Sequence, residues 1–356
     1  MCSAVKLSSW IFLVISVLMI FSGVFLCNYA RDKAPSAEAI DGYTTTEDGQ
    51  SFLELDYSEQ RIATISLNLK NCDVEIRGGS EDAKVELIGF KPNSYIANVT
   101  NKTIKVSNQI SIMDYFSLDG SGVSFAGVWR TLLSLTGEQK EVTPEVIVYV
   151  PADQDIKQFN LTFDNCNVNM VNLVGKTEYS IVSNKAKIDI NTLGASIVDI
   201  SCDDTEISAI NATIDHLTYD MAGGNFVARN LISEDMVFSG KEGEINLIDA
   251  DFADFNLKMT QCDLTISTVY TQGSYQRAIL VEDGEIYLGD LLLGKEDFSP
   301  EGETAPGKLT ITLEEGKVVT KYGDRQLVLE DEAPTTSEPS TSEPPASGEP
   351  NASDAT

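Results

Sequence analysis

The single histidine of the chain, His216, limits the chemistry that this sequence can support. Ser-His-Asp and Cys-His catalysis both need a histidine to carry the proton, and histidine is also a frequent ligand of catalytic metal ions. His216 stands beside the apolar residues Leu217 and Tyr219 of an expected strand, where a structural position at a turn explains it. We therefore expect no site of these three classes.

Acidic side chains near residue 250 come closest to a reactive cluster. Asp249, Asp251 and Asp254 follow one another closely, and Asp203 and Asp204 occupy an earlier turn. Elongated β-proteins can use paired carboxylates or bound calcium to act on polysaccharides. This stretch lacks the glycine and the terminal glutamate of a calcium loop, and no basic cluster stands beside it. Solvated turn acids explain the same pattern, so we assign no catalytic, cofactor-binding or metal-ligating residue and predict a protein that is not an enzyme.

A repeat of about 20 residues runs through residues 155–292 and would position these side chains. One apolar residue marks each repeat, within a short alternating strand: Val168, Ile188, Ile207, Val227, Ile245, Leu264 and Ile286. A second strand precedes each marker by about seven residues, and turns rich in Asn, Asp and Gly separate the two strands. Alternation with period two between such turns is typical of strands that bury one face.

A fixed period near 20 with two strands per unit predicts an all-β fold of the β-solenoid type, in which each repeat is one coil. One coil buries too few apolar side chains to offset the conformational entropy of its residues, so it needs stacked neighbours. An ordinary β-sandwich of short strands is the alternative, because its turns recur at intervals of about 8–12 residues.

Six cysteines are present, and none of them forms the Cys-x-x-Cys spacing of zinc or thioredoxin-like sites: Cys2, Cys27, Cys72, Cys166, Cys202 and Cys262. Cys72 and Cys166 occur in matching contexts, Asn-Cys-Asp-Val and Asn-Cys-Asn-Val. Equivalent positions on adjacent coils lie ~4.8 Å apart, which is within disulfide range. The pattern fits a buried pair of stacked thiols, and it also fits a Cys72–Cys166 bridge.

Residues 8–27, SSWIFLVISVLMIFSGVFLC, carry no charge and are long enough for a helix to cross a membrane. We predict one transmembrane helix, an uncleaved signal anchor within residues 1–29, with the short N-terminal stub on the inner side of the cell membrane and the C-terminal domain extracytoplasmic. Lys6 before the stretch and Arg31 and Lys33 after it leave the positive-inside count open. Cleavage as a signal peptide is the alternative.

The remaining sequence divides by composition. Residues 30–50 are polar and are expected to be a linker, and residues 51–330 to form the β-solenoid domain. Residues 331–356 are rich in Pro, Ser, Thr and acid, which predicts a disordered tail. Strands around Leu309, Val318 and Leu327 are expected to form a C-terminal cap.

Residues 92–143 interrupt the repeat and are interpreted as an insertion. Ile104/Val106 and Ile110/Ile112 could form a hairpin, and an apolar stretch with Trp129 follows. Because insertions in solenoids map to one face, this segment is a candidate for a specific contact.

The net charge of −30, from 55 acidic and 25 basic residues, disfavours nucleic acid and anionic lipid surfaces as partners. Cations, basic peptides and neutral glycans are easier to accommodate. An acidic surface also simply keeps a protein soluble.

The stretches NLKNCDVEIRGGSEDAKVEL and EVIVYVPADQDIKQFNLTF, with the repeated strand–turn–strand units, resemble a known group over about residues 53–330. They are similar to the bacterial adhesin-like family of β-strand-repeat domains of unknown function. The resemblance implies a right-handed β-solenoid, a single N-terminal membrane anchor in some members, and an association with cell-envelope stress systems. It implies no catalytic residue and no cofactor.

We therefore expect a non-enzymatic, membrane-anchored extracytoplasmic protein that interacts with the cell envelope in the manner of an adhesin. Its expected partners are the membrane, through the N-terminal helix, and a cell-wall component or a protein, but not nucleic acid. The first alternative is an accessory or regulatory protein of an envelope-stress signalling system. The second is a calcium-dependent polysaccharide-active enzyme that uses Asp251 and Asp254.

Overall fold

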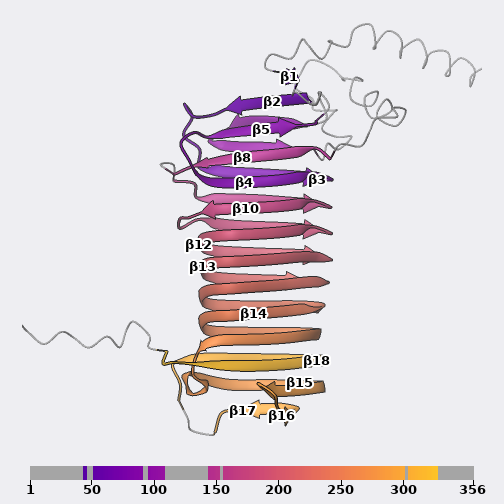
Figure 1. Cartoon of the computed structure of the whole chain (residues 1–356), viewed down its shortest axis with the longest axis vertical. Helices are drawn as coiled ribbons and strands as arrows, with labels where there is room; N and C mark the ends of the chain where they lie inside the picture. Colours follow the sequence, from indigo (N-terminus) through magenta and orange to yellow (C-terminus); the bar gives the residue numbers. More distant parts are fainter. Residues whose placement is uncertain are drawn as a thin grey trace, which may run out of the picture.

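The chain winds into stacked layers of β-strand that form a long rod (Figure 1). The computed structural model describes residues 43–45, 51–90, 95–108, 143–152, 155–300 and 304–327. The predicted membrane helix in residues 8–27, the predicted tail and most of the predicted insertion lie outside these residues. Within the described ranges, no helix is long and apolar enough to cross a membrane.

The regular elements of the described residues are strands, apart from one short 3-10 helix. In chain order they are β1 (Tyr43–Thr45), β2 (Ser51–Asp56), β3 (Thr64–Lys70), β4 (Asp73–Ser80), β5 (Lys84–Ile88), β6 (Ile96–Thr100), β7 (Thr103–Ser107), β8 (Glu145–Pro151), β9 (Gln158–Asp164), β10 (Asn167–Leu173), β11 (Glu178–Asn184), β12 (Lys187–Asp203), β13 (Thr205–Met221), β14 (Gly224–Tyr270), η3 (Gln272–Ser274), β15 (Tyr275–Leu288), β16 (Leu291–Gly294), β17 (Glu296–Phe298) and β18 (Gly307–Arg325).

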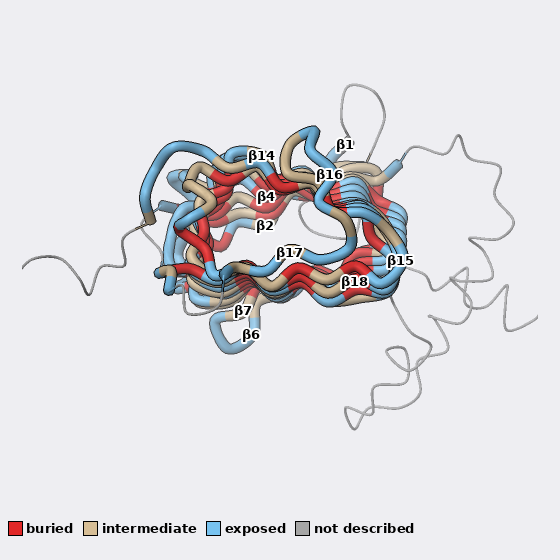
Figure 2. Tube along the Cα trace, turned by 90° about the horizontal axis from the view of Figure 1, so that it is seen from below, coloured by how far each residue is buried: buried red, intermediate tan, exposed pale blue. Residues whose placement is uncertain are grey.

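Neighbouring layers of the rod pair in parallel and in register. Ile188 of β12 faces Ile207 of β13, which in turn faces Phe226 of β14, so each step spans 19 residues. Pairing is interrupted at Thr192 and Ser196, where the chain bends between one long side and the next. Seen along the rod, buried residues line the inside of a flattened tube (Figure 2). The predicted all-β coiled architecture is confirmed, whereas its right-handedness stays a prediction.

The prediction that Val227 is the inward-facing marker of its repeat was wrong by one residue. Phe226 faces Ile207 and is buried, whereas Val227 faces Ser208 and is only half-buried. Phe226, Val227 and Ala228 are apolar at three consecutive positions, so alternation alone does not tell which of them points inward.

The C-terminal end of the rod departs from chain order. Leu264 of β14 faces Val318 of β18, and Val318 faces Ile286 of β15 on its other side. The predicted step from Leu264 directly to Ile286 is therefore wrong, and the strands around Leu309 and Val318 form an inner layer rather than a cap. Figure 1 shows β18 between β14 and β15. After β14 the chain leaves the position of one layer open and forms β15 beyond it. β18 later occupies the open position between β14 and β15.

The short strands β16 and β17 cover the C-terminal end. Both pair antiparallel with β15. The Arg277 guanidinium on β15 donates to Asp297 on β17 at 3.1 Å, and both side chains are largely buried. Leu291, Leu292 and Phe298 remain exposed on this cap.

The N-terminal end shows the same departure from chain order. Val74 of β4 faces Val146 of β8 on one side and Val168 of β10 on the other. On the opposite long side, β3 separates β7 from β9. Thus β8 lies one layer further out than β4, although it precedes β9 in the chain. β5 and β2 continue outward from β8 in antiparallel pairs.

Residues 96–107, which we had placed within the predicted insertion 92–143, belong to this end of the rod. β6 and β7 form a hairpin around Asn101 and Lys102, whose φ angles of 53° and 64° are those of a two-residue turn. Ile104 of β7 faces Ile65 of β3. The strand at Ile104/Val106 thus pairs with β6 and β3, and the predicted partner Ile110/Ile112 lies outside the described residues.

Candidate binding site at a corner of the coil

One corner of the coil is built on residues with a left-handed backbone. Asn172, Thr192, Asn211, Asn230 and Asp249 occupy it in successive layers, with φ between 54° and 64°. Asn and Asp tolerate this conformation better than other residues with a side chain. The Asn230 side-chain amide also donates to Asn211 Oδ1 at 3.0 Å, which links two layers. These residues form a column along the rod at the corner that follows each marker strand, which is not the corner of the predicted Asn- and Asp-rich turns.

This column ends where β18 enters the stack. Thr268 faces Tyr322, but Tyr270 faces Arg325, so Gly323 and Asp324 both stand opposite Val269. The extra residue is a β-bulge, which bends and twists the strand locally. A side chain at position 323 would bring its Cβ to 2.3 Å from the Val269 carbonyl oxygen, so the close approach of the two strands requires glycine.

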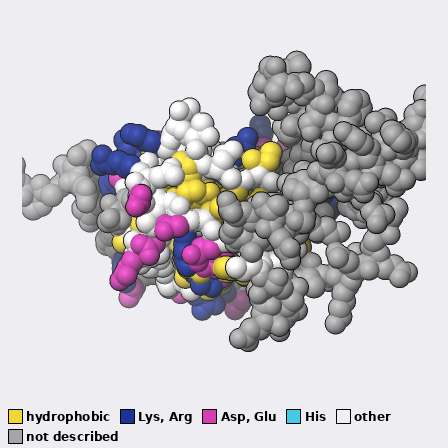
Figure 3. All heavy atoms as spheres, turned by 90° about the horizontal axis from the view of Figure 1, so that it is seen from above, with side chains coloured by type: hydrophobic (Ala, Val, Ile, Leu, Met, Phe, Trp, Pro, Cys, Tyr) yellow, Lys and Arg dark blue, Asp and Glu magenta, His cyan; other side chains and the backbone are white. Residues whose placement is uncertain are grey.

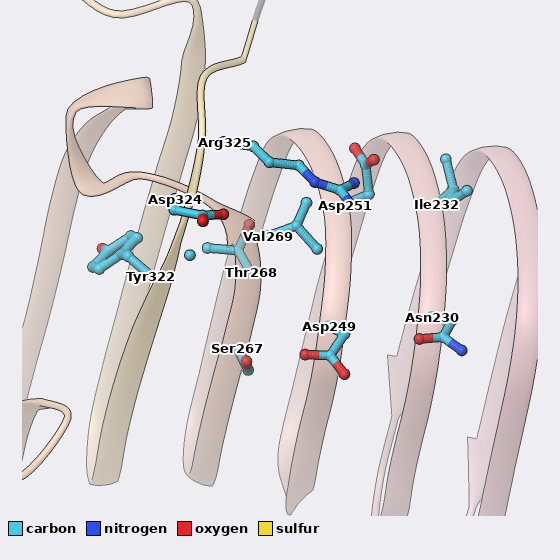
Figure 4. Close-up of a pocket in the computed structure, with 11 residues that line it drawn as sticks. Asn230, Ile232, Asp249, Asp251, Ser267, Thr268, Val269, Tyr322, Asp324 and Arg325 are labelled. Carbon is cyan, nitrogen blue, oxygen red and sulfur yellow. The ribbon is translucent and has the colours of Figure 1, made fainter.

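A cavity of about 530 Å³ lies at the corner beside the bulge (Figure 4). Four layers line it: Asn230 and Ile232, then Asp249 and Asp251, then Ser267 to Val269, and finally Tyr322 to Arg325 of β18. In Figure 4, the Arg325 side chain extends across the corner toward Asp251, whereas the Tyr322 ring points away from the other lining side chains. The site thus presents carboxylates, an amide, hydroxyls and a guanidinium together.

Asp251 is held in place by a neighbour on the next layer. The Tyr270 hydroxyl donates to Asp251 Oδ1 at 2.6 Å. Burial, with this hydrogen bond to a carboxylate, raises the pKa of Tyr270 to about 12. Tyr270 is therefore neutral at physiological pH, and the Asp251 carboxylate keeps a fixed donor and a fixed direction.

The structure brings together two of the five acids singled out in the sequence. Asp249 and Asp251 line the cavity. Asp254 instead accepts from the Lys308 backbone N–H at 3.1 Å, and Asp203 and Asp204 belong to another turn, where the Asp203 carbonyl accepts from Lys185 N–H at 2.9 Å. In the part of the chain that the structure describes, no three His, Cys, Asp or Glu residues are grouped so as to hold a metal ion.

Arg325 and the Ser267–Val269 layer were missed from the sequence. Their contribution depends on β18 lying next to β14, which is 54 residues away along the chain at the pair Asp254–Lys308. The only local signal is Gly323-Asp324-Arg325, which ends β18 after its alternating residues.

His216 lies on the outer surface of β13 and is exposed, facing Ile197 and Asp235 of the adjoining layers. It is not among the residues that line the cavity. A structural position for this histidine agrees with these surroundings.

The cysteine pair is stacked, as one of the two predicted alternatives requires. Cys72 Sγ and Cys166 Sγ lie 3.8 Å apart, and both residues are buried and in the thiol form. Cys202 and Cys262 are also buried free thiols.

Charged residues at the N-terminal end form mutually satisfied pairs rather than a second site. Lys84 Nζ lies 2.7 Å from Glu86 and 3.3 Å from Glu54, and 4.4 Å from the centre of the Tyr149 ring. Arg77 lies 2.6 Å from Glu75. Figure 3, which views this end of the rod, shows acidic and basic side chains intermixed.

No curated protein matches the chain. Similar solved structures include a candidate adhesin of Parabacteroides merdae, with 12% identity and a TM-score of 0.46, over 78% of this chain and 98% of that chain. A candidate lipid-binding protein of Parabacteroides distasonis has 9% identity and a TM-score of 0.48, over 78% and 98% of the two chains. A candidate cell adhesion protein of Clostridium sporogenes has 10% identity and a TM-score of 0.20, over 77% and 98%.

The family comparison covers most of the rod and confirms the resemblance drawn from the strand repeats. The model of the family described as Toastrack DUF4097 matches residues 62–333, from just before β3 to just beyond β18. With this span, the chain belongs to the Toastrack DUF4097 family, a family of unknown function with a repetitive β architecture.

Proposed function

We propose that this protein is a non-enzymatic, adhesin-like binding module of the cell envelope, which holds a neutral, hydroxyl-rich ligand such as a glycan in the corner cavity. The observation that carries the proposal is the mixed set of donors and acceptors that four layers bring together there. Concave sites with a few convergent polar groups are the usual places for ligand binding.

The chemistry of the cavity favours sugar hydroxyls over charged ligands. Asp249 and Asp251 accept hydrogen bonds, Arg325 donates them, and Ser267 does both. A hydroxyl group is both donor and acceptor and can pair with each of these side chains. Anionic polymers are disfavoured because Asp324 adds a third carboxylate to the lining and the whole chain carries a charge of −30.

The extracytoplasmic location and the membrane anchor rest on residues 8–27, whose uncharged length suits one membrane crossing. In this arrangement, the anchor fixes one end of the chain at the cell membrane, and the rod extends the cavity away from it. Cavity and anchor lie at opposite ends of the sequence, which suits a module that reaches from the membrane toward the wall.

The proposal is tested by cosedimentation of soluble residues 34–330 with purified cell walls and, separately, with membranes of the source organism. The first variant is Arg325→Ala, because its exposed guanidinium can be removed without emptying the core. Hydrogen bonds to charged groups contribute about 1.5–3 kcal/mol, so binding should weaken by about tenfold or more. The matched control is Lys187→Ala, which removes an exposed cation on β12, outside the cavity lining.

Saturable wall binding that Arg325→Ala weakens and Lys187→Ala leaves unchanged would support the proposal. Wall binding that neither variant alters would place the ligand elsewhere on the rod. No binding to walls, with binding only to membranes that carry native proteins, would refute the glycan proposal. That result would favour the accessory role in envelope-stress signalling, which stays a prediction because it rests on residues 1–29 and on the insertion.

The polysaccharide-active enzyme receives less support from the arrangement of the acids. Asp254, one of its two predicted carboxylates, is engaged by the Lys308 backbone and is not among the residues that line the cavity. Turnover of an acidic polysaccharide in the presence of calcium, lost in Asp251→Asn, would reverse this assessment.

A further inference from the structure

The stacked thiols of Cys72 and Cys166 occupy equivalent positions in two adjoining layers. Asp73 faces Asn167 at the start of β4 and β10, so the residues just before them are also opposite each other. Asn71 and Asn165 have nearly identical left-handed φ angles of 52° and 53°, and the Asn165 amide donates to Asn71 Oδ1 at 2.7 Å. The two corners therefore superpose, and they direct both cysteine side chains into the core in parallel.

This geometry suits a covalent bond. Residues opposite each other in parallel strands lie ~4.8 Å apart, inside the disulfide range of about 4.4–6.8 Å between Cα atoms. The sulfur atoms are already 3.8 Å apart, so side-chain rotation with a small approach of the two corners can bring them to bonding distance. At the other two cysteines of the described residues, the paired positions hold no cysteine: Cys202 faces Ser183 and Met221, and Cys262 faces Gly316 of β18.

We propose that Cys72 and Cys166 form a reversible disulfide when the protein meets a disulfide oxidant, and that this bond fastens the N-terminal end of the rod. One thiolate attacks a sulfur of the oxidant, forms a mixed disulfide and releases one thiol. The second cysteine then attacks the mixed disulfide at the protein sulfur, forms the Cys72–Cys166 bond and releases the second thiol. The pair loses two electrons and two protons, and the oxidant is reduced to two thiols.

The position of the bond gives it a mechanical consequence. Between β4 and β9 the chain forms the terminal strands β5 to β8. β3 and β4 are therefore held against the next layer by their pairing with β9 and β10, and not by a direct chain connection. A Cys72–Cys166 bond closes a loop of 94 residues that contains the whole cap excursion. It therefore restricts the unfolded chain and prevents the layer of β3 and β4 from separating from the layer of β9 and β10.

Access for the oxidant comes from the position at the end of the stack. Both cysteines are buried in the closed rod. The layer of β3 and β4 is covered on its outer side only by the few terminal strands β7, β8, β5 and β2, and layers near the end of a stacked repeat open more often than layers in its middle. The hydrogen bond between the two thiols raises the pKa of Cys72 and lowers that of Cys166. Because both side chains are buried, the oxidant reaches them only through these openings.

The test treats the full chain in detergent, under native conditions, with glutathione disulfide, followed by alkylation, trypsin and mass spectrometry. Cleavage after lysine and arginine places Cys72 in peptide 71–77 and Cys166 in peptide 158–176. We expect a linked pair of these peptides, lighter than their sum by two hydrogen atoms, and its loss on reduction. We also expect the oxidised protein to have an apparent Tm higher by about 10 °C.

Two variants separate this bond from general oxidation. Cys72→Ser should abolish the linked peptide and the Tm shift, whereas Cys262→Ser should keep both. If Cys72→Ser does not fold, the peptide map of the unaltered chain still shows whether Cys72 and Cys166 become linked. Glutathione attached to Cys166 without linkage, linkage only after unfolding in urea, or linkage without a Tm shift would each overturn the proposal.

Discussion

Replacing Gly316 by alanine tests directly whether β18 lies inside the stack. Gly316 is between Cys262 of β14 and Gly284 of β15, with φ of 135°. A Cβ at this position would lie 2.0 Å from the Cys262 carbonyl oxygen and 2.8 Å from its carbon. Because these are backbone atoms, side-chain rotation cannot relieve the overlap, and β18 must move away from β14.

The cost has two parts. A side chain in this backbone region is strained by about 1–3 kcal/mol, and overpacking against a fixed neighbour adds about 1–3 kcal/mol. We therefore expect Gly316→Ala to lower the free energy of unfolding by about 4 kcal/mol. At roughly 2–4 °C per kcal/mol for a domain of this size, the apparent Tm should fall by about 8–16 °C.

The assay is thermal and urea unfolding of residues 34–330, followed by circular dichroism. The matched control is Gly273→Ala in η3, where an added Cβ would meet nothing within 4 Å. If Gly316→Ala were as stable as the control, Gly316 would not be packed between two backbones, and the position of β18 would be wrong.

Three further predictions follow from the corners, the cap and the buried tyrosines. Asn211→Val should lower the free energy of unfolding by about 2 kcal/mol in urea titrations. A β-branched residue is strained at φ 57°, and the hydrogen bond from Asn230 is lost. The control Asn225→Val, at an exposed position of β14, should change the free energy of unfolding little. Arg277→Ala should lower it by about 3 kcal/mol or more by leaving the largely buried Asp297 without its partner, and an equal effect of Lys187→Ala would contradict this reason. Burial raises the pKa of Tyr322 and, together with the hydrogen bond to Asp251, that of Tyr270, both to about 12. Since these values lie above the ordinary tyrosine value of 10, the stability that the two neutral hydroxyls contribute should be complete below pH 10 and lost as pH rises to 12. Tyrosinate absorbance titrated against pH checks this, and ionisation of all tyrosines near pH 10 in the folded protein would contradict it.

The strands and turns of this rod can be predicted from the sequence more readily than the order in which its layers stack. Ile188 and Ile207 could be aligned because each alternates with polar neighbours and follows a turn rich in Asn or Asp. Phe226 was missed because its neighbour Val227 is equally apolar. The insertion of Val318 between Leu264 and Ile286 leaves no local trace, since any of these three residues fits against either of the others.

The same limit applies to the candidate site. Asp249 and Asp251 were found because acids at close spacing are visible in a sequence. Arg325 was not, because it reaches the corner only after the chain has passed the cap and returned. Which side chains share a cavity depends on long-range pairing, and the pattern of each strand alone does not specify its partner.

The out-of-order layer at β18 is the central claim, because it completes both the stack and the cavity. Cysteine pairs at outward-facing positions test it most directly. Asn256 faces Thr310, and Thr310 faces Ala278 on its other side. Adjacent layers lie ~4.8 Å apart and alternate layers about twice as far, beyond disulfide reach. We predict that cysteines at 256 and 310 become linked on mild oxidation, whereas cysteines at 256 and 278 do not. Linkage of 256 with 278 would show that β14 and β15 are neighbours and would contradict the account.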